Sequence, residues 1–143
     1  MGIKFKRLLA LNIDGVISIL IPSLIFDIFQ RVINYIFFHE FSAEINFDLG
    51  LHLFFHIVLL IFYLYSMYFL FVRKDTFFKG GSLGKKLCRI LIVNYHNEIV
   101  VDKNILISRV KENINNFILY PAHILTNVDT SGDIKYKTKV IKK

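Results

Sequence analysis

Two long apolar runs restrict the folds that are open to this chain. The first, Leu8 to Ile25, has 18 residues and one formal charge, and the second, Leu51 to Val72, has 22 residues without Asp, Glu, Lys or Arg. As helices rising about 1.5 Å per residue, these runs match a hydrocarbon core of about 30 Å. Hydrophobic residues make up 55% of the 143 residues and aromatic residues 15%, which is typical of a small membrane protein. We predict membrane-spanning helices at about residues 8–29 and 51–72.

The distribution of charge predicts an orientation. Basic residues precede the first run, and the chain from residue 73 onward carries 14 Lys and Arg against 6 Asp and Glu. The segment between the runs is acidic, with four carboxylates against Arg31. By the positive-inside rule we expect a multi-pass protein of the cell (inner) membrane with both termini in the cytoplasm. The net charge of +7 then reflects a surface facing anionic lipid, and no nucleic-acid partner is expected.

The segments around the two runs suggest shorter elements. Pro22 is expected to bend the first helix, and the amphipathic pattern that follows predicts a helix lying along the outer interface. Residues 39–50 are predicted to form a loop. After the second run, residues 79–82 break the chain and residues 83–88 form a short helix. Residues 89–93 and 98–101 are predicted to form a small cytoplasmic β-hairpin.

The last third of the chain leaves two interpretations open. Leu106, Val110 and Ile114 share a helical face, but three charged residues lie within 109–112. Residues 105–125 therefore form either a helix in the inner interface that rises from Phe117, or a third span. The polar, lysine-rich residues 126–143 are predicted to be a disordered cytoplasmic tail. The fold class is an all-α membrane protein with two transmembrane helices, interfacial helices and a small cytoplasmic β-hairpin.

Asp14 is the most informative polar residue, since a carboxylate inside a spanning helix costs roughly 2.5–3.5 kcal/mol. It is either a hydrogen-bonded anchor that specifies packing, or an ion or proton site, or a group that reaches toward the interface. Arg7 lies on the same helix face, about 10 Å along the axis. That separation is too long for a direct ion pair, but both groups could serve one polar site.

Other motifs carry less weight. Residues 79–86 fail the phosphate-loop pattern, because Lys79 replaces its first Gly and Lys86 its Ser or Thr. His52 and His56 stand at metal-ligand spacing, but two neutral histidines in a polar crevice explain them as well. The single cysteine, Cys88, is expected to be a small buried residue. With no nucleophile–base set, we expect no enzymatic activity and no metal or other cofactor.

Residues 6–15 (KRLLALNIDG) and residues 82–94 (SLGKKLCRILIVN) resemble the RDD family of small bacterial membrane proteins. In that family an arginine begins the first transmembrane helix and an aspartate lies within it. The resemblance extends over residues 4–125 and implies one membrane domain there. Asn94 stands where the family's second aspartate is expected. Transport, including cation–proton exchange, has been suggested for some members.

Two functions follow as hypotheses. In the first, the chain contributes to ion or solute transport, with Arg7 and Asp14 as its polar centre and Lys85, Lys86 and Arg89 as cytoplasmic counter-charges. In the second, it is a non-transporting scaffold or accessory subunit of a membrane complex. Because two or three helices do not enclose a water-filled path, we expect a homo-oligomer or a partner membrane protein.

Overall fold

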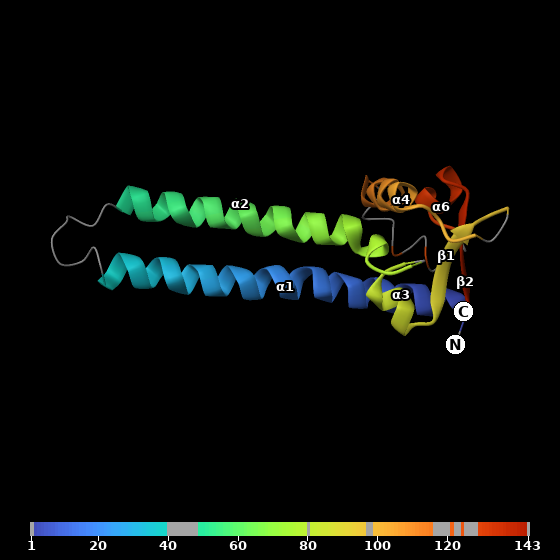
Figure 1. Cartoon of the computed structure of the whole chain (residues 1–143), viewed down its shortest axis with the longest axis horizontal. Helices are drawn as coiled ribbons and strands as arrows, with labels where there is room; N and C mark the ends of the chain where they lie inside the picture. The colour runs from blue at the N-terminus through green and yellow to red at the C-terminus, as the bar shows by residue number, and fades with distance from the viewer. Residues whose placement is uncertain are drawn as a thin grey trace. The chain divides into compact units, whose positions relative to one another are not determined.

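The computed structural model of the chain describes residues 2–39, 49–79, 81–96, 99–115, 121, 124 and 129–142. The chain divides into two compact units, which we call the polar unit (residues 1–16 and 70–143) and the apolar unit (residues 17–69). The elements are α1 (Ile3–His39), α2 (Leu49–Arg73), η1 (Lys74–Thr76), α3 (Leu83–Leu87), β1 (Ile90–Asn94), α4 (Lys103–Asn115), α6 (Ser131–Lys135) and β2 (Thr138–Lys142). Figure 1 labels all of them except the short η1.

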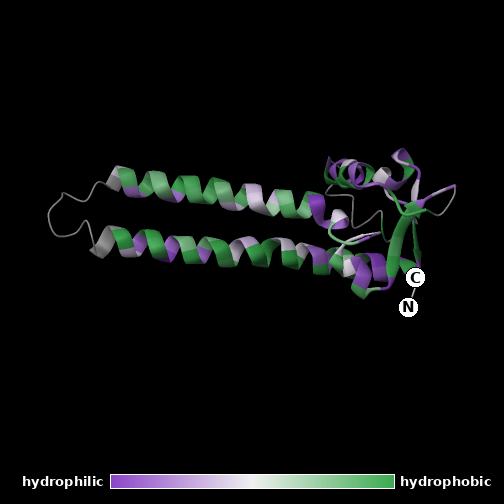
Figure 2. Cartoon of the chain, viewed as in Figure 1, coloured by the Kyte–Doolittle hydropathy of each residue, from purple (hydrophilic) through white to green (hydrophobic). Residues whose placement is uncertain are grey.

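The apolar unit consists of the greater part of α1 and α2, and hydrophobic residues dominate both helices (Figure 2). Residues 3–36 and 50–76 are each long and apolar enough to cross a membrane. A few polar and aromatic contacts join the helices: the Ser23 and Tyr63 hydroxyl oxygens are 3.2 Å apart, and the Phe26 and Tyr63 ring centroids 5.2 Å. The prediction of a mostly helical protein with two candidate spanning helices and a small antiparallel sheet is confirmed.

The first helix is longer than predicted. α1 runs without interruption for 37 residues and contains Pro22, so no separate interfacial helix follows the proline. A proline removes one backbone hydrogen bond, but here the helix continues past it. Asp27 and Arg31, four residues apart on α1, form a local ion pair at 3.0 Å. The predicted loop at 39–50 lies almost wholly outside the described residues.

In the polar unit, β1 pairs with the C-terminal strand β2 in an antiparallel sheet, from Ile90 opposite Lys142 to Asn94 opposite Thr138. The predicted hairpin therefore has the correct first strand and the wrong partner, because the described residues 99–101 contribute an isolated bridge of Val93 with Val100 and no strand. Pairing with β2 buries Ile90, Ile92 and Val140 in one core, together with Ala10, Cys88, Val101 and Leu106. That shared burial explains the choice of partner.

The prediction of a disordered tail at 126–143 is wrong for residues 129–142, which form α6 and β2. In β2, Thr138 and Val140 are buried, whereas Lys139 and Ile141 are only partly buried. This alternation, which is typical of a strand, was not recognised in the lysine-rich sequence. Of residues 105–125, for which an interfacial helix and a third span were both considered, the structure describes 105–115, 121 and 124. α4 is a 13-residue helix whose buried face includes Arg109 and Asn113, which pack inside the polar unit. The predicted rise from Phe117 to Leu125 lies mostly outside the described residues.

Candidate functional site: a buried charge network

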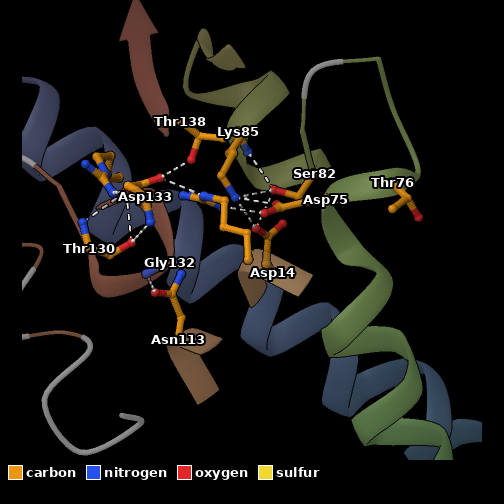
Figure 3. Close-up of polar contacts among 12 residues, drawn as sticks. Asp14, Asp75, Thr76, Ser82, Lys85, Asn113, Thr130, Gly132, Asp133 and Thr138 are labelled. Carbon is orange, nitrogen blue, oxygen red and sulfur yellow. Dashed lines mark hydrogen bonds and ion pairs between the residues drawn. The ribbon is translucent and has the colours of Figure 1, made fainter. Parts of the chain in front are cut away.

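Six charged side chains, each at most 7% exposed, meet inside the polar unit. Figure 3 shows the contacts among them and the hydroxyl and amide groups around them. We call this set the charge network; it consists of Arg7, Asp14, Asp75, Lys85, Arg109 and Asp133. Buried charges are costly unless they are paired and hydrogen-bonded, so each partner matters.

Asp133 joins the two ends of the chain. Its carboxylate accepts from Arg7 Nη2 and from Arg109 Nε, both at 2.6 Å. The hydroxyls of Thr130 and Thr138 also donate to it, at 2.9 and 3.0 Å, and Thr130 and Asp133 form the capping box that begins α6. Burial by itself would raise the pKa of Asp133, but the guanidinium groups of Arg109 and Arg7 outweigh it and hold the pKa well below its ordinary value.

Arg109 bridges two carboxylates. Besides Asp133, it donates from Nη1 to Asp75 Oδ2 at 2.9 Å, and Asp75 also accepts from Lys85 Nζ at 2.5 Å. Arg109 reaches this position because it lies on the buried face of α4, between Leu106 and Asn113. Asn113 Oδ1 in turn accepts the backbone N–H of Gly132 at 2.9 Å, which fixes α6 against α4.

Asp14 ties α3 to α1. One carboxylate oxygen accepts the Ser82 hydroxyl at 2.5 Å, the other accepts the backbone N–H of Gly84 at 2.8 Å, and Lys85 Nζ lies 4.0 Å away. The fit is close, because a Cβ on Gly84 would lie 2.3 Å from the carbonyl oxygen of Ala10. Glycine is therefore required where α3 crosses α1.

The sequence-predicted site residues fall into two groups. Arg7, Asp14 and Lys85 belong to the charge network, but Arg7 pairs with Asp133 and not with Asp14. Lys86 and Arg89 are exposed and lie outside the network. The Lys86 amine lies 4.8 Å from the ring centroid of Phe78. Arg89 has a positive φ of 54° at the turn between α3 and β1.

Sequence reasoning missed Asp75, Arg109 and Asp133. A signal existed for two of them. Leu106, Arg109, Val110 and Asn113 follow the i, i+3, i+4, i+7 spacing of one helical face, so Arg109 could have been recognised as inward-facing. Thr130 and Asp133 have the spacing of a capping box. For Asp75 the only indication in the sequence was its position shortly after the second apolar run.

The balance of charge limits the chemistry of the network. Three carboxylates face three cations, and the contacts described above occupy oxygens of all three carboxylates. Among the described residues, no group of three or more His, Cys, Asp or Glu could hold a metal ion.

The neighbouring Lys74 is 4% exposed, and its amine lies 3.9 Å from the ring centroid of Phe71. Lys74 Nζ has no hydrogen-bond partner within the described ranges. The buried region is thus compensated, with one additional amine at its edge.

The two histidines of α2 do not join this site. His56 Nδ1 lies 2.9 Å from the backbone oxygen of His52, and His52 Nε2 lies 3.3 Å from Asn34 Oδ1. Both histidines are partly buried, and their ring nitrogens lie near polar groups of the apolar unit.

Comparison with known proteins gives one match. The sequence matches the RDD family over residues 4–103, which takes in α1, α2, Asp14, Asp75 and Lys85. The match ends before Arg109 and Asp133. No curated protein and no solved structure matches the chain.

Proposed function

Because this chain belongs to the RDD family of membrane proteins, we propose that it is a membrane scaffold or accessory subunit. In this role it holds a folded polar unit at one surface of the membrane. The observation that supports this proposal is the charge network, in which the carboxylates of Asp14, Asp75 and Asp133 are all held by donors from other segments. The network fastens the start of α1, the end of α2, α3, α4 and α6 to one another.

The contacts of Arg109 support a two-span arrangement. Arg109 pairs with Asp75, directly after α2, and with Asp133 near the C-terminus, so these three positions lie on one side of a membrane that α1 and α2 cross. Arg7, before the first run, pairs with the same Asp133. Together with the basic residues after residue 73, this favours a multi-pass protein of the cell (inner) membrane with both termini in the cytoplasm.

Ion or solute transport is the second candidate, and Asp14 is the observation that favours it. Its carboxylate lies in an apolar helix, within 2.5 Å of the Ser82 hydroxyl and 4.0 Å of the Lys85 amine. A proton or cation that exchanged there would have to displace these donors, at a substantial cost in free energy. Transport would also require self-association or a partner, since two helices do not enclose a path.

Flux in liposomes separates the two candidates. The purified full chain is reconstituted with a pH-sensitive dye inside, and proton movement is measured under gradients of Na⁺ and K⁺. The variants are Asp14→Asn and, as a control, Asp27→Asn, which removes an exposed carboxylate of the same helix. The scaffold proposal expects no flux above empty liposomes from any of the three proteins. Flux that is present in wild type and in Asp27→Asn but absent in Asp14→Asn would contradict the scaffold proposal and support transport.

A further inference from the structure

A basic cavity lies in the polar unit, apart from the charge network's ion pairs. It has a volume of about 600 Å³ and lies between the turn after η1, α3 and the start of β1. Its walls include Phe78, Lys79, Lys86, Arg89, Ile90 and Leu91. Among the described residues that line it, three are cationic and none is acidic.

The local backbone sets the cationic wall. Phe78 and Gly81 exchange two backbone hydrogen bonds of 3.2 Å, which close a tight turn that carries Lys79. Gly81 has φ of 152°, and a Cβ there would lie 3.0 Å from Lys85 Cδ, so this turn requires glycine. Arg89, which also lines the cavity, adopts a positive φ of 54°, a conformation that Gly and, less readily, Asn and Asp adopt at low cost in free energy.

The chemistry of the walls indicates a phosphate group joined to an apolar body. Several Lys and Arg side chains without an acidic neighbour favour an anion, and Arg binds phosphate through two parallel N–H donors. Phe78, Ile90 and Leu91 add an apolar surface that inorganic phosphate would leave unused. A volume of about 600 Å³ lies in the range of small-ligand sites.

The position in the chain connects the cavity to the membrane surface. Phe78 lies five residues after the last residue of α2, and the polar unit includes the final turn of that helix. Phe77 and Leu87, next in sequence to Phe78 and Lys86, are 55% and 63% exposed. Exposed apolar side chains beside cations are typical of a surface at the level of lipid headgroups.

We propose that this cavity binds the phosphate headgroup of an anionic phospholipid, with Lys79, Lys86 and Arg89 around the phosphate and the apolar wall against the glycerol and upper acyl region. This is a discrete site, beyond the general attraction of a basic surface to anionic lipid. It does not depend on whether the protein transports ions or acts as a scaffold.

Lipid binding by the purified full chain in neutral detergent micelles tests the proposal. Fluorescently labelled phosphatidylglycerol is titrated into the protein, with labelled phosphatidylcholine and inorganic phosphate as separate arms. The test variant combines Lys79→Gln, Lys86→Gln and Arg89→Asn, where asparagine tolerates the positive φ. The control combines Lys111→Gln, Lys142→Gln and Lys137→Asn, three exposed lysines of the same unit, of which Lys137 also has a positive φ, 49°.

The expected result is a loss of at least about tenfold in phosphatidylglycerol affinity for the test variant, and less than about twofold for the control. An equal loss in both variants would reduce the site to diffuse electrostatics and overturn the proposal. So would phosphatidylcholine binding as tight as phosphatidylglycerol binding, or displacement of the lipid by millimolar inorganic phosphate. If the triple variant does not fold, Lys79→Gln and Lys86→Gln are compared singly with Lys111→Gln by the same criteria.

Discussion

Arg7 and Asp133 lie 126 positions apart in the sequence, yet Nη2 of Arg7 is 2.6 Å from Oδ2 of Asp133. The side chains of this pair are 5% and 0% exposed, so the pair is buried. It joins the start of the first apolar helix to the short helix near the C-terminus. Because Asp133 also binds Arg109, three segments depend on one carboxylate.

Removing that carboxylate should destabilise the protein strongly. Asp133→Asn leaves the guanidinium group of Arg7 buried without its counter-charge and removes one of the two carboxylates that hold Arg109. We expect a loss of about 3–5 kcal/mol in the free energy of unfolding. Chemical unfolding of the purified chain in detergent measures it. Glu112→Gln is the control, since it breaks a pair with the largely exposed Lys135 and should cost less than about 1 kcal/mol. Similar losses in the two variants would contradict the role assigned to Asp133.

Because of Asp133, the free energy of unfolding should also decrease in acid. The pKa of Asp133 is lowered in the folded protein, whereas the unfolded chain takes up this proton near the ordinary value of about 3.9. Below that pH the unfolded state binds more protons than the folded state, so the free energy of unfolding decreases as pH falls. We expect Asp133 to add nothing to the pH dependence above about pH 5 and a progressive loss below about pH 4.

Unfolding curves of wild type and Asp133→Asn between pH 6 and pH 2.5 provide the measurement. The acid-induced loss should be smaller in the variant, because the titrating group is gone. Parallel pH dependences in the two proteins would show that Asp133 is not the group responsible.

Two helical glycines should respond in opposite directions to alanine. At Gly84 the added Cβ would lie 2.3 Å from Ala10 O and 2.8 Å from Asp14 Oδ1, so α3 must move away from α1. We expect Gly84→Ala to cost about 1–3 kcal/mol or more. Gly15 has nothing within 4 Å of its Cβ position, and Gly15→Ala should stabilise the helix by about 0.5–1 kcal/mol. Thermal unfolding of both variants tests the pair, and a stable Gly84→Ala protein would contradict the close crossing.

Both ends of the chain should be protected from an impermeant thiol reagent in intact cells. Cysteines placed at Gly2 and at Lys142, both exposed in the polar unit, should not react, whereas one at Ser42, between the two helices, should react. Wild type is the control, because Cys88 is buried and burial raises the pKa of its thiol. Labelling at Lys142 but not at Gly2 would place the two ends on opposite sides and contradict the contact of Arg7 with Asp133.

Part of the site could be predicted from the sequence. Asp14 stood out because a carboxylate in an apolar helix demands a partner, and Arg7 and Lys85 were selected as charges near it. Their actual partners could not be predicted, since helical spacing describes neighbours within one helix and Arg7 pairs across 126 positions. Arg109 was considered only as one of three charged residues within 109–112, although it lies on the buried face of α4.

The sequence by itself determined the two apolar helices, the position of the first strand and the need of Asp14 for a polar partner. The length of an apolar run and its local periodicity are properties of consecutive residues, so both can be read without a structure. The tertiary structure decided which strand pairs with β1, that residues 129–142 are folded, and which cation compensates which carboxylate. Those choices depend on desolvation: a lysine-rich segment becomes ordered when its few inward-facing groups, such as Asp133 and Val140, find buried partners.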